Sequence, residues 1–160
     1  MAQETKMQIE DLISESDLLM ESLRSFFYSI PIQHDPYLGS GICSIADLPK
    51  LWEYDSETKI DPFEDPVLHY RWFRLTQEQF LEQEELFRRY ISWASSVRAL
   101  VEKFLPEKLV VFDEKSQVIR KWIELSERLP SDDNAEMFLR FRKYFISQQN
   151  IVFSLSEHIG

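Results

Sequence analysis

The feature that most constrains this chain is a set of long stripes of apolar residues at helical spacing, separated by prolines. In residues 4–30, apolar side chains recur at steps of three and four, with acidic side chains between them. This spacing predicts one amphipathic helix, which Pro31 ends because proline has no N–H to donate. Ser16 interrupts the stripe, so we expect tight or locally polar packing there. The apolar stripe consists of Ile9, Leu12, Ile13, Leu19, Met20, Leu23, Phe26, Phe27 and Ile30.

A second long helix is predicted from residue 77 to Leu105, where Pro106 ends it. Thr76 offers an N-cap hydroxyl, and Gln79 stands three residues later, in the position of a capping box. Two apolar seams follow at steps of seven and are predicted to face the core, although the same spacing could equally serve the seam of a dimer. The first seam contains Phe80, Phe87, Ala94 and Val101, and the second contains Tyr90, Val97 and Phe104.

Two shorter segments lie beside this helix. Asp65-Pro66 is typical of a helix start, because an N-cap acceptor precedes proline at the first helical position. It predicts a helical segment through residues 67–75. Residues 108–112 (KLVVF) are rich in β-branched side chains, but no partner strand is evident. We interpret them as a linker whose apolar side chains fill the end of the bundle.

The fourth helix is predicted to begin at Asp113 or Ser116 and to end at Leu129. Its apolar residues recur at helical spacing, so one side of it should face the core. These inward residues are Val118, Ile119, Trp122, Ile123 and Leu125.

A last helix is predicted after Pro130, with Ser131 as its N-cap. Asp132 and Asp133 lie near its positive dipole end and should support it. Its apolar stripe is rich in phenylalanine, which predicts a buried position. The stripe contains Phe138, Phe141, Phe145, Val152 and Leu155, and Met137, Tyr144 and Ile151 widen it.

Residues 31–65 differ from the rest, because they are acidic and contain most of the prolines and two of the three glycines. A short helix is predicted from Ser44 to about Tyr54, and the other residues are expected to wrap the bundle. The prediction for residues 1–160 is therefore a single all-α domain. It is an antiparallel four-helix bundle with a long acidic, partly helical connection between the first and second long helices.

The negative charge is placed unevenly along the chain. The formal net charge is −10, and residues 1–66 hold half of the 28 acidic residues but only four of the 18 basic ones. Such a surface repels phosphate backbones and anionic lipid, which argues against nucleic acid or a membrane as the main partner. The acidic third either keeps the chain soluble or faces a partner protein with a basic surface.

Cysteine use and the N-terminus favour a cytoplasmic protein. Cys43 is the only cysteine and cannot form an internal disulfide, which points to a reducing compartment. The first residues lack the charged-then-apolar pattern of a signal peptide, and no apolar run approaches transmembrane length. We expect a cytoplasmic protein of bacterial or phage type.

No motif in the sequence predicts catalysis, a cofactor or a metal. Asp65 and His69 would share a helical face, but no second pair of ligands accompanies them. Di-iron bundles need Glu-x-x-His, which the chain lacks, and Glu84–Arg88 and Glu85–Arg89 are the spacing of ordinary ion pairs. Cys43 lies in an acidic stretch, which does not favour a thiolate. We therefore expect a protein that is not an enzyme.

Two basic–aromatic stretches, residues 71–74 and 140–144, could stack on single-stranded nucleic acid. The net charge disfavours this reading, and the arginines are expected instead to meet the acidic third of the chain, within the fold or across a dimer.

The leading hypothesis is a non-catalytic protein–protein interaction module, such as an adaptor, an assembly factor, or an inhibitor or immunity-type protein. Its acidic N-terminal third and exposed aromatic residues would bind the partner, because aromatic and arginine side chains concentrate binding energy at interfaces. The residues predicted to bind are Trp52, Tyr54, Asp55, Glu57, Arg71, Trp72 and Arg74. Self-association is compatible with this hypothesis.

The alternative is a helical bundle or sensor that binds a small ligand in an aromatic-lined pocket. Three polar residues, Ser16, Gln83 and Gln148, lie where the stripes call for apolar ones. If they converge on one cavity, this alternative gains support. If they face solvent or bond to the backbone, it loses support.

Overall fold

The computed structural model describes residues 2–30, 32–35, 70–73, 75–127 and 133–159. The described residues form four α-helices, a short two-stranded sheet and one 3-10 turn. They are α1 (Ala2–Ser29), β1 (Ile32–Asp35), β2 (Tyr70–Phe73), α4 (Gln77–Phe104), η3 (Pro106–Lys108), α5 (Leu109–Ile123) and α6 (Asn134–Ile159).

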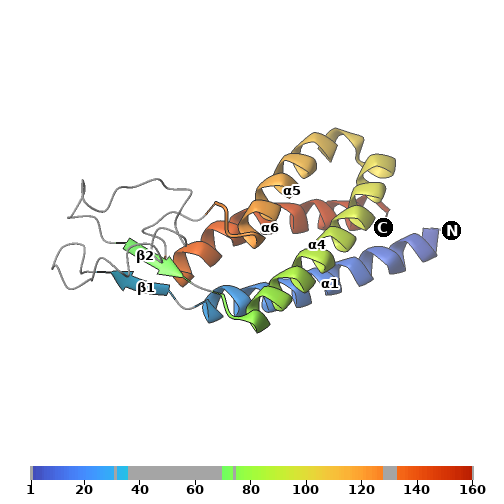
Figure 1. Ribbon diagram of the computed structural model, residues 1–160. Helices are drawn as coiled ribbons and strands as arrows, with labels where there is room; N and C mark the ends of the chain where they lie inside the picture. The colour runs from blue at the N-terminus through green and yellow to red at the C-terminus, as the bar shows by residue number, and fades with distance from the viewer. Residues whose placement is uncertain (1, 31, 36–69, 74, 128–132, 160) are drawn as a thin grey trace.

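The helices form an antiparallel bundle in which the chain runs back and forth (Figure 1). α1 packs against α4 and α6, and α5 packs against the same two helices from the other side. The start of α1 and the end of α6 lie at one end of the bundle, and β1 and β2 lie at the other (Figure 1). The predicted all-α four-helix bundle is confirmed.

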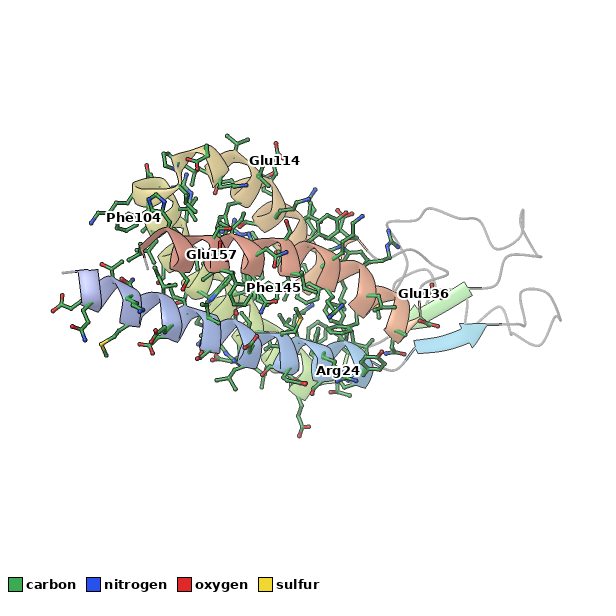
Figure 2. The ribbon with its side chains drawn as sticks, turned by 180° about the vertical axis from the view of Figure 1, so that it is seen from behind. Arg24, Phe104, Glu114, Glu136, Phe145 and Glu157 are labelled. Atoms are coloured by element: carbon green, nitrogen blue, oxygen red, sulfur yellow. The ribbon has the colours of Figure 1, made fainter. Side chains whose placement is uncertain are left out.

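Burial of the apolar stripes explains why these segments form helices and associate. The α6 stripe is buried as predicted, and Phe141 and Phe145 stack with ring centroids 5.7 Å apart. Figure 2 shows Phe145 inside the bundle, between α6 and α1, whereas Glu114 lies at the outer edge of α5. On α1, the buried residues at the core are Ile9, Leu19, Leu23, Phe26 and Phe27.

The end of α1 is capped by side chains from distant parts of the sequence. Asn134 Nδ2 donates to Phe27 O at 2.7 Å and to Ile30 O at 2.8 Å. Gln79 Nε2 donates to Ser29 O at 2.8 Å. These bonds satisfy carbonyl groups that the last turn of a helix leaves without an intrahelical partner.

The capping box predicted for α4 is confirmed. The seam that α4 buries, however, is shifted by one residue from the predicted seam that begins at Phe80. Gln79 N donates to the Thr76 hydroxyl, and Thr76 N donates to Gln79 Oε1. Phe80 is 50% exposed and Phe87 only half-buried. The buried residues at steps of three and four are instead Leu86, Tyr90, Trp93, Val97 and Leu100, together with Ala94 and Val101.

The interpretation of residues 108–112 as a linker is wrong, because α5 begins at Leu109. Phe112 is buried, but Val110 is 68% exposed and Val111 is also exposed, so the two valines do not fill the end of the bundle. The helical hydrogen bonds outweigh the β propensity of an isolated segment that has no strand to pair with.

α5 also ends earlier than predicted, at Ile123. Leu125 takes a left-handed backbone conformation, with φ of 66°, and Ser126 N donates to Lys121 O. These are the features of a helix C-terminus, where the left-handed residue is usually glycine. Burial of the Leu125 side chain offsets the steric cost of that conformation.

The helical segment predicted for residues 67–75 is also wrong, since Tyr70–Phe73 is a strand. β1 and β2 pair antiparallel, with Ile32 opposite Phe73 and Asp35 opposite Tyr70. The end of α1 lies beside the start of α4 in space, where Gln79 binds Ser29. The segment that follows α1 therefore runs beside the segment that precedes α4. The two segments therefore lie close enough to pair. The short helix predicted near Ser44 lies outside the described residues.

The N-cap of α6 differs from the prediction. Glu136 N donates to Asp133 Oδ1 at 2.8 Å, so Asp133 caps the helix in the role assigned to Ser131. An aspartate in this place also complements the helix dipole.

Candidate functional site

The residues predicted to bind a partner are largely outside the described structure. Trp52, Tyr54, Asp55, Glu57 and Arg74 are not among the described residues. Arg71 and Trp72 lie on β2, where their backbones pair with His34 and Gln33. A binding role for these seven residues therefore stays a prediction.

The three polar residues within the apolar stripes do not converge on one cavity. Ser16 is buried between α1 and α6, where its hydroxyl donates to Ile13 O and accepts from Gln149 Nε2. Gln83 Nε2 donates to Ile123 O at 2.7 Å, at the end of α5. Gln148 lies elsewhere, in the core between α4, α5 and α6. Each residue has a structural partner, so the hypothesis of a polar pocket in the core loses the support that convergence would have provided.

Gln148 is the centre of a buried network. Tyr90 Oη donates to Gln148 Oε1 at 2.7 Å, and Gln148 Nε2 donates to Phe112 O at 3.0 Å and to Ser116 Oγ at 2.7 Å. Ser116 Oγ is also within hydrogen-bond distance of the Tyr90 hydroxyl, at 3.2 Å. The amide and the phenol are both fully buried, and each has its hydrogen bonds satisfied.

The environment of Tyr90 strongly favours the neutral phenol. Burial of the hydroxyl raises the pKa of Tyr90 to about 12, although the hydrogen bonds with Ser116 and Gln148 and the charge of Arg120 act in the opposite direction. The tyrosine is therefore protonated at neutral pH, and its hydroxyl joins α4 to α5 and α6 through Ser116 and Gln148.

The ion pairs of α4 differ from those predicted. Arg88 pairs with Glu85 at 3.1 Å, and Arg89 reaches Glu15 on α1 at 3.6 Å. Arg89, which lies outside the two basic–aromatic stretches, therefore meets the acidic third of the chain. In the second stretch, Arg140 lies over the ring of Trp122. Within the described residues, no group of acidic, histidine and cysteine side chains could hold a metal ion.

The outer face of α1 is acidic and carries exposed apolar side chains. α1 contains six acidic and two basic residues, whereas α5 and α6 together contain six basic and four acidic ones. Met7 is 59% exposed and Leu18 is 61% exposed. They are eleven residues apart, about three helical turns, and so lie on the same face. The acidic residues of α1 are Glu4, Glu10, Asp11, Glu15, Asp17 and Glu21.

A second surface is a groove of about 560 Å³ beside the first half of α4. Phe87 and Ile91 form its apolar part, and Glu84, Arg88 and Glu124 provide charged groups around it. Phe80 lies one heptad before Phe87 and extends the same apolar line. Of the predicted seam residues at the start of α4, Phe80 is thus exposed and Phe87 is partly buried against the core. In the sequence, this surface is indicated by the apolar residues of α4 that exceed the number needed for one buried seam.

The chain matches no protein-family model, no curated protein and no solved structure. Among the described helices there is none whose length and hydropathy would let it cross a membrane.

Proposed function

We propose that this chain is a non-catalytic protein–protein interaction module that binds a partner with a basic surface through the outer face of α1. The observation that supports this proposal is the pairing of negative charge with exposed apolar side chains on that face. Met7 and Leu18 are exposed there, and Asp11 and Glu21 lie on the same line at steps of three and four.

The negative charge of α1 is largely available to a partner. In the described part of the chain, Glu15 is the one α1 acid that forms an ion pair with another helix, and Glu21 pairs with Arg24 on α1 itself. Complementary charge speeds the encounter of two proteins, and burial of apolar side chains at the centre of the contact supplies affinity. A partner with basic residues around an apolar centre fits both features.

The hydrogen bonds of the polar residues within the apolar stripes favour a role in binding a protein over a role in sensing a small ligand. Ser16, Gln83 and Gln148 are each occupied by hydrogen bonds within the bundle. The bundle then serves as a rigid support that presents the α1 face.

The experiment is to capture the partner from the native host, to reconstitute the complex from purified components, and to compare matched variants. Leu18→Ser removes an apolar contact from α1, and Leu139→Ser, at 58% exposure on α6, is its control. Asp11→Lys with Glu21→Lys reverses charge on α1, and Glu114→Lys with Glu157→Lys makes the same change in net charge elsewhere. We expect the α1 variants to weaken binding about tenfold or more, mainly through the association rate for the charge variant.

Salt provides an independent measurement, because electrostatic steering is screened at high ionic strength. Association should slow as salt rises. If the two charge variants behave alike, or if Leu18→Ser binds as tightly as Leu139→Ser, α1 is not the binding surface and the proposal fails.

A further inference from the structure

The first half of α4 presents an apolar line that the bundle leaves partly uncovered. Phe80 is 50% exposed, and Phe87 and Ile91 are half-buried at steps of seven and four. These steps keep the three side chains on one face of the helix. Leu81, which is also exposed, lies beside this line.

The length of α5 explains why the line is uncovered. α5 has 15 residues and α4 has 28, so α5 cannot follow the whole of α4. α5 ends at Ile123, where Gln83 binds its carbonyl group, and the chain then turns at Leu125. The groove lies where α4 continues beside that end, with Glu124 at its edge.

The charges around the groove follow an order along α4 that is complementary to the same helix in a second, antiparallel copy. Acidic residues at 82, 84 and 85 precede basic residues at 88 and 89 along α4. Arg89 is occupied by α1, where it contacts Glu15 and Ser22. Glu84 forms no ion pair within the described residues, and it lines the groove together with Arg88.

Two copies of such a helix, placed antiparallel about a twofold axis, bring the acidic block of one against the basic block of the other. When the axis lies midway between Glu84 and Arg88, Glu84 of each copy faces Arg88 of the other, and the pair occurs twice. The same arrangement sets Leu81 of one copy opposite Ile91 of the other, with Phe80 beside it. An interface of this kind uses one patch on both copies and closes as a dimer.

We propose that the occupant of this groove is a second copy of the chain, so that α4 pairs antiparallel with α4 of its partner. The proposal goes beyond the interaction proposed for α1, which lies on a different face of the bundle. It leaves the α1 face of each copy free, so a dimer would present two such faces to a basic partner.

The test is the oligomeric state of the purified full-length chain, measured by sedimentation equilibrium over a wide concentration range. We expect a reversible monomer–dimer equilibrium. Phe80→Ser should raise the dimer dissociation constant at least about tenfold, since the substitution acts twice in a symmetric interface. Phe153→Ser on α6, at a similar exposure of 45%, is the control and should leave the constant unchanged.

Charge reversal tests the register. Glu84→Arg and Arg88→Glu should each weaken the dimer, because each places like charges opposite one another. The double variant should restore dimerisation to within about threefold of the original, as expected for a coupled pair. Circular dichroism and thermal unfolding at a concentration where all variants are monomeric show that the fold is unchanged.

A chain that is monomeric at every concentration overturns the proposal. So does a dimer that responds equally to Phe80→Ser and Phe153→Ser, or one in which the double charge variant is no stronger than the single ones. Binding of the basic partner to the monomeric Phe80→Ser variant is measured separately, so failure of the dimer and failure of the α1 surface can be told apart.

Discussion

The buried hydrogen bond between Tyr90 and Gln148 provides the sharpest test of how this bundle is stabilised. Tyr90→Phe removes the phenol that donates to Gln148 Oε1 and changes little else in shape. The amide oxygen then stays in the core without a donor, because Gln148 is fully buried. Leaving a buried polar group unsatisfied costs about 1–3 kcal/mol, so we expect a loss of about 2 kcal/mol in the free energy of unfolding.

The partner substitution, Gln148→Leu, sharpens the prediction. It leaves the Tyr90 hydroxyl without the amide, although Ser116 Oγ is 3.2 Å away and can accept its proton. When both side chains are apolar, neither the amide oxygen nor the phenol is left unpaired. The double variant should therefore be more stable than the sum of the single changes by about 1–2 kcal/mol.

The assay is urea unfolding followed by far-ultraviolet circular dichroism, with thermal unfolding as a second measurement. In a chain of this length each kcal/mol should lower Tm by about 2–4 °C. Tyr144→Phe is the control, because its hydroxyl has no hydrogen-bond partner in the part of the chain that the structure describes. The reasoning is refuted if Tyr90→Phe costs no more than Tyr144→Phe, or if the double variant equals the sum of the singles.

Three further predictions concern the same bundle. Burial raises the pKa of Tyr90 from 10.0 to about 12, so the phenol holds its proton more tightly in the folded state than in the unfolded state. The resulting stabilisation of the folded state is complete below about pH 10 and is lost as the pH rises towards 12. Unfolding titrations from neutral to alkaline pH should therefore show the advantage of the original chain over Tyr90→Phe shrinking by about 2–3 kcal/mol, and a constant difference would contradict the assignment. Thr76→Ala removes the capping box of α4 and should cost about 1 kcal/mol in urea unfolding, whereas Ser25→Ala on the exposed side of α1 should cost almost nothing. Trp93→Phe removes the bond from the indole nitrogen to Leu12 O, which joins α4 to α1 at 2.8 Å, and should destabilise the fold by about 1–3 kcal/mol; an unchanged urea midpoint would show that this bond contributes nothing.

The sequence was sufficient to predict the helices whose apolar stripes are long. α1, α4 and α6 each bury a stripe at steps of three and four, and Thr76 and Gln79 form the capping box that their spacing indicates. Periodicity works for these segments because burial of one face decides the structure of the whole segment.

Short segments were predicted less well, because tertiary neighbours decide their structure. Tyr70–Phe73 pairs with β1 only because two helix ends bring the segments together, and local sequence cannot report this. Residues 109–112 are helical although their composition favours a strand. Tertiary context outweighs such weak local preferences.

The sequence indicated the charge of the proposed interaction surface but not its place in the fold. The excess of acid in the first part of the chain was visible in the sequence, and α1 carries part of it on an exposed face. The apolar line of α4 was assigned to the core, because the sequence does not state where α5 ends. The stop at Ile123 depends on Leu125, a residue that rarely takes a left-handed conformation, so it left no recognisable signal.

The capping of α1 has a consequence for the order in which the chain folds. Asn134 is 107 positions from Phe27, and α1 makes its most extensive contact with α6, the last helix that the structure describes. During synthesis the apolar stripe of α1 leaves the ribosome long before α6 exists, and we expect the acidic residues beside that stripe to help to keep it dispersed in that interval. Closing a loop of this length has a slowly growing entropy cost, about 0.6 kcal/mol for each doubling. Productive folding of this chain is therefore expected to wait for its C-terminal helix, and ribosome-bound chains that lack α6 should expose the α1 stripe to chaperones.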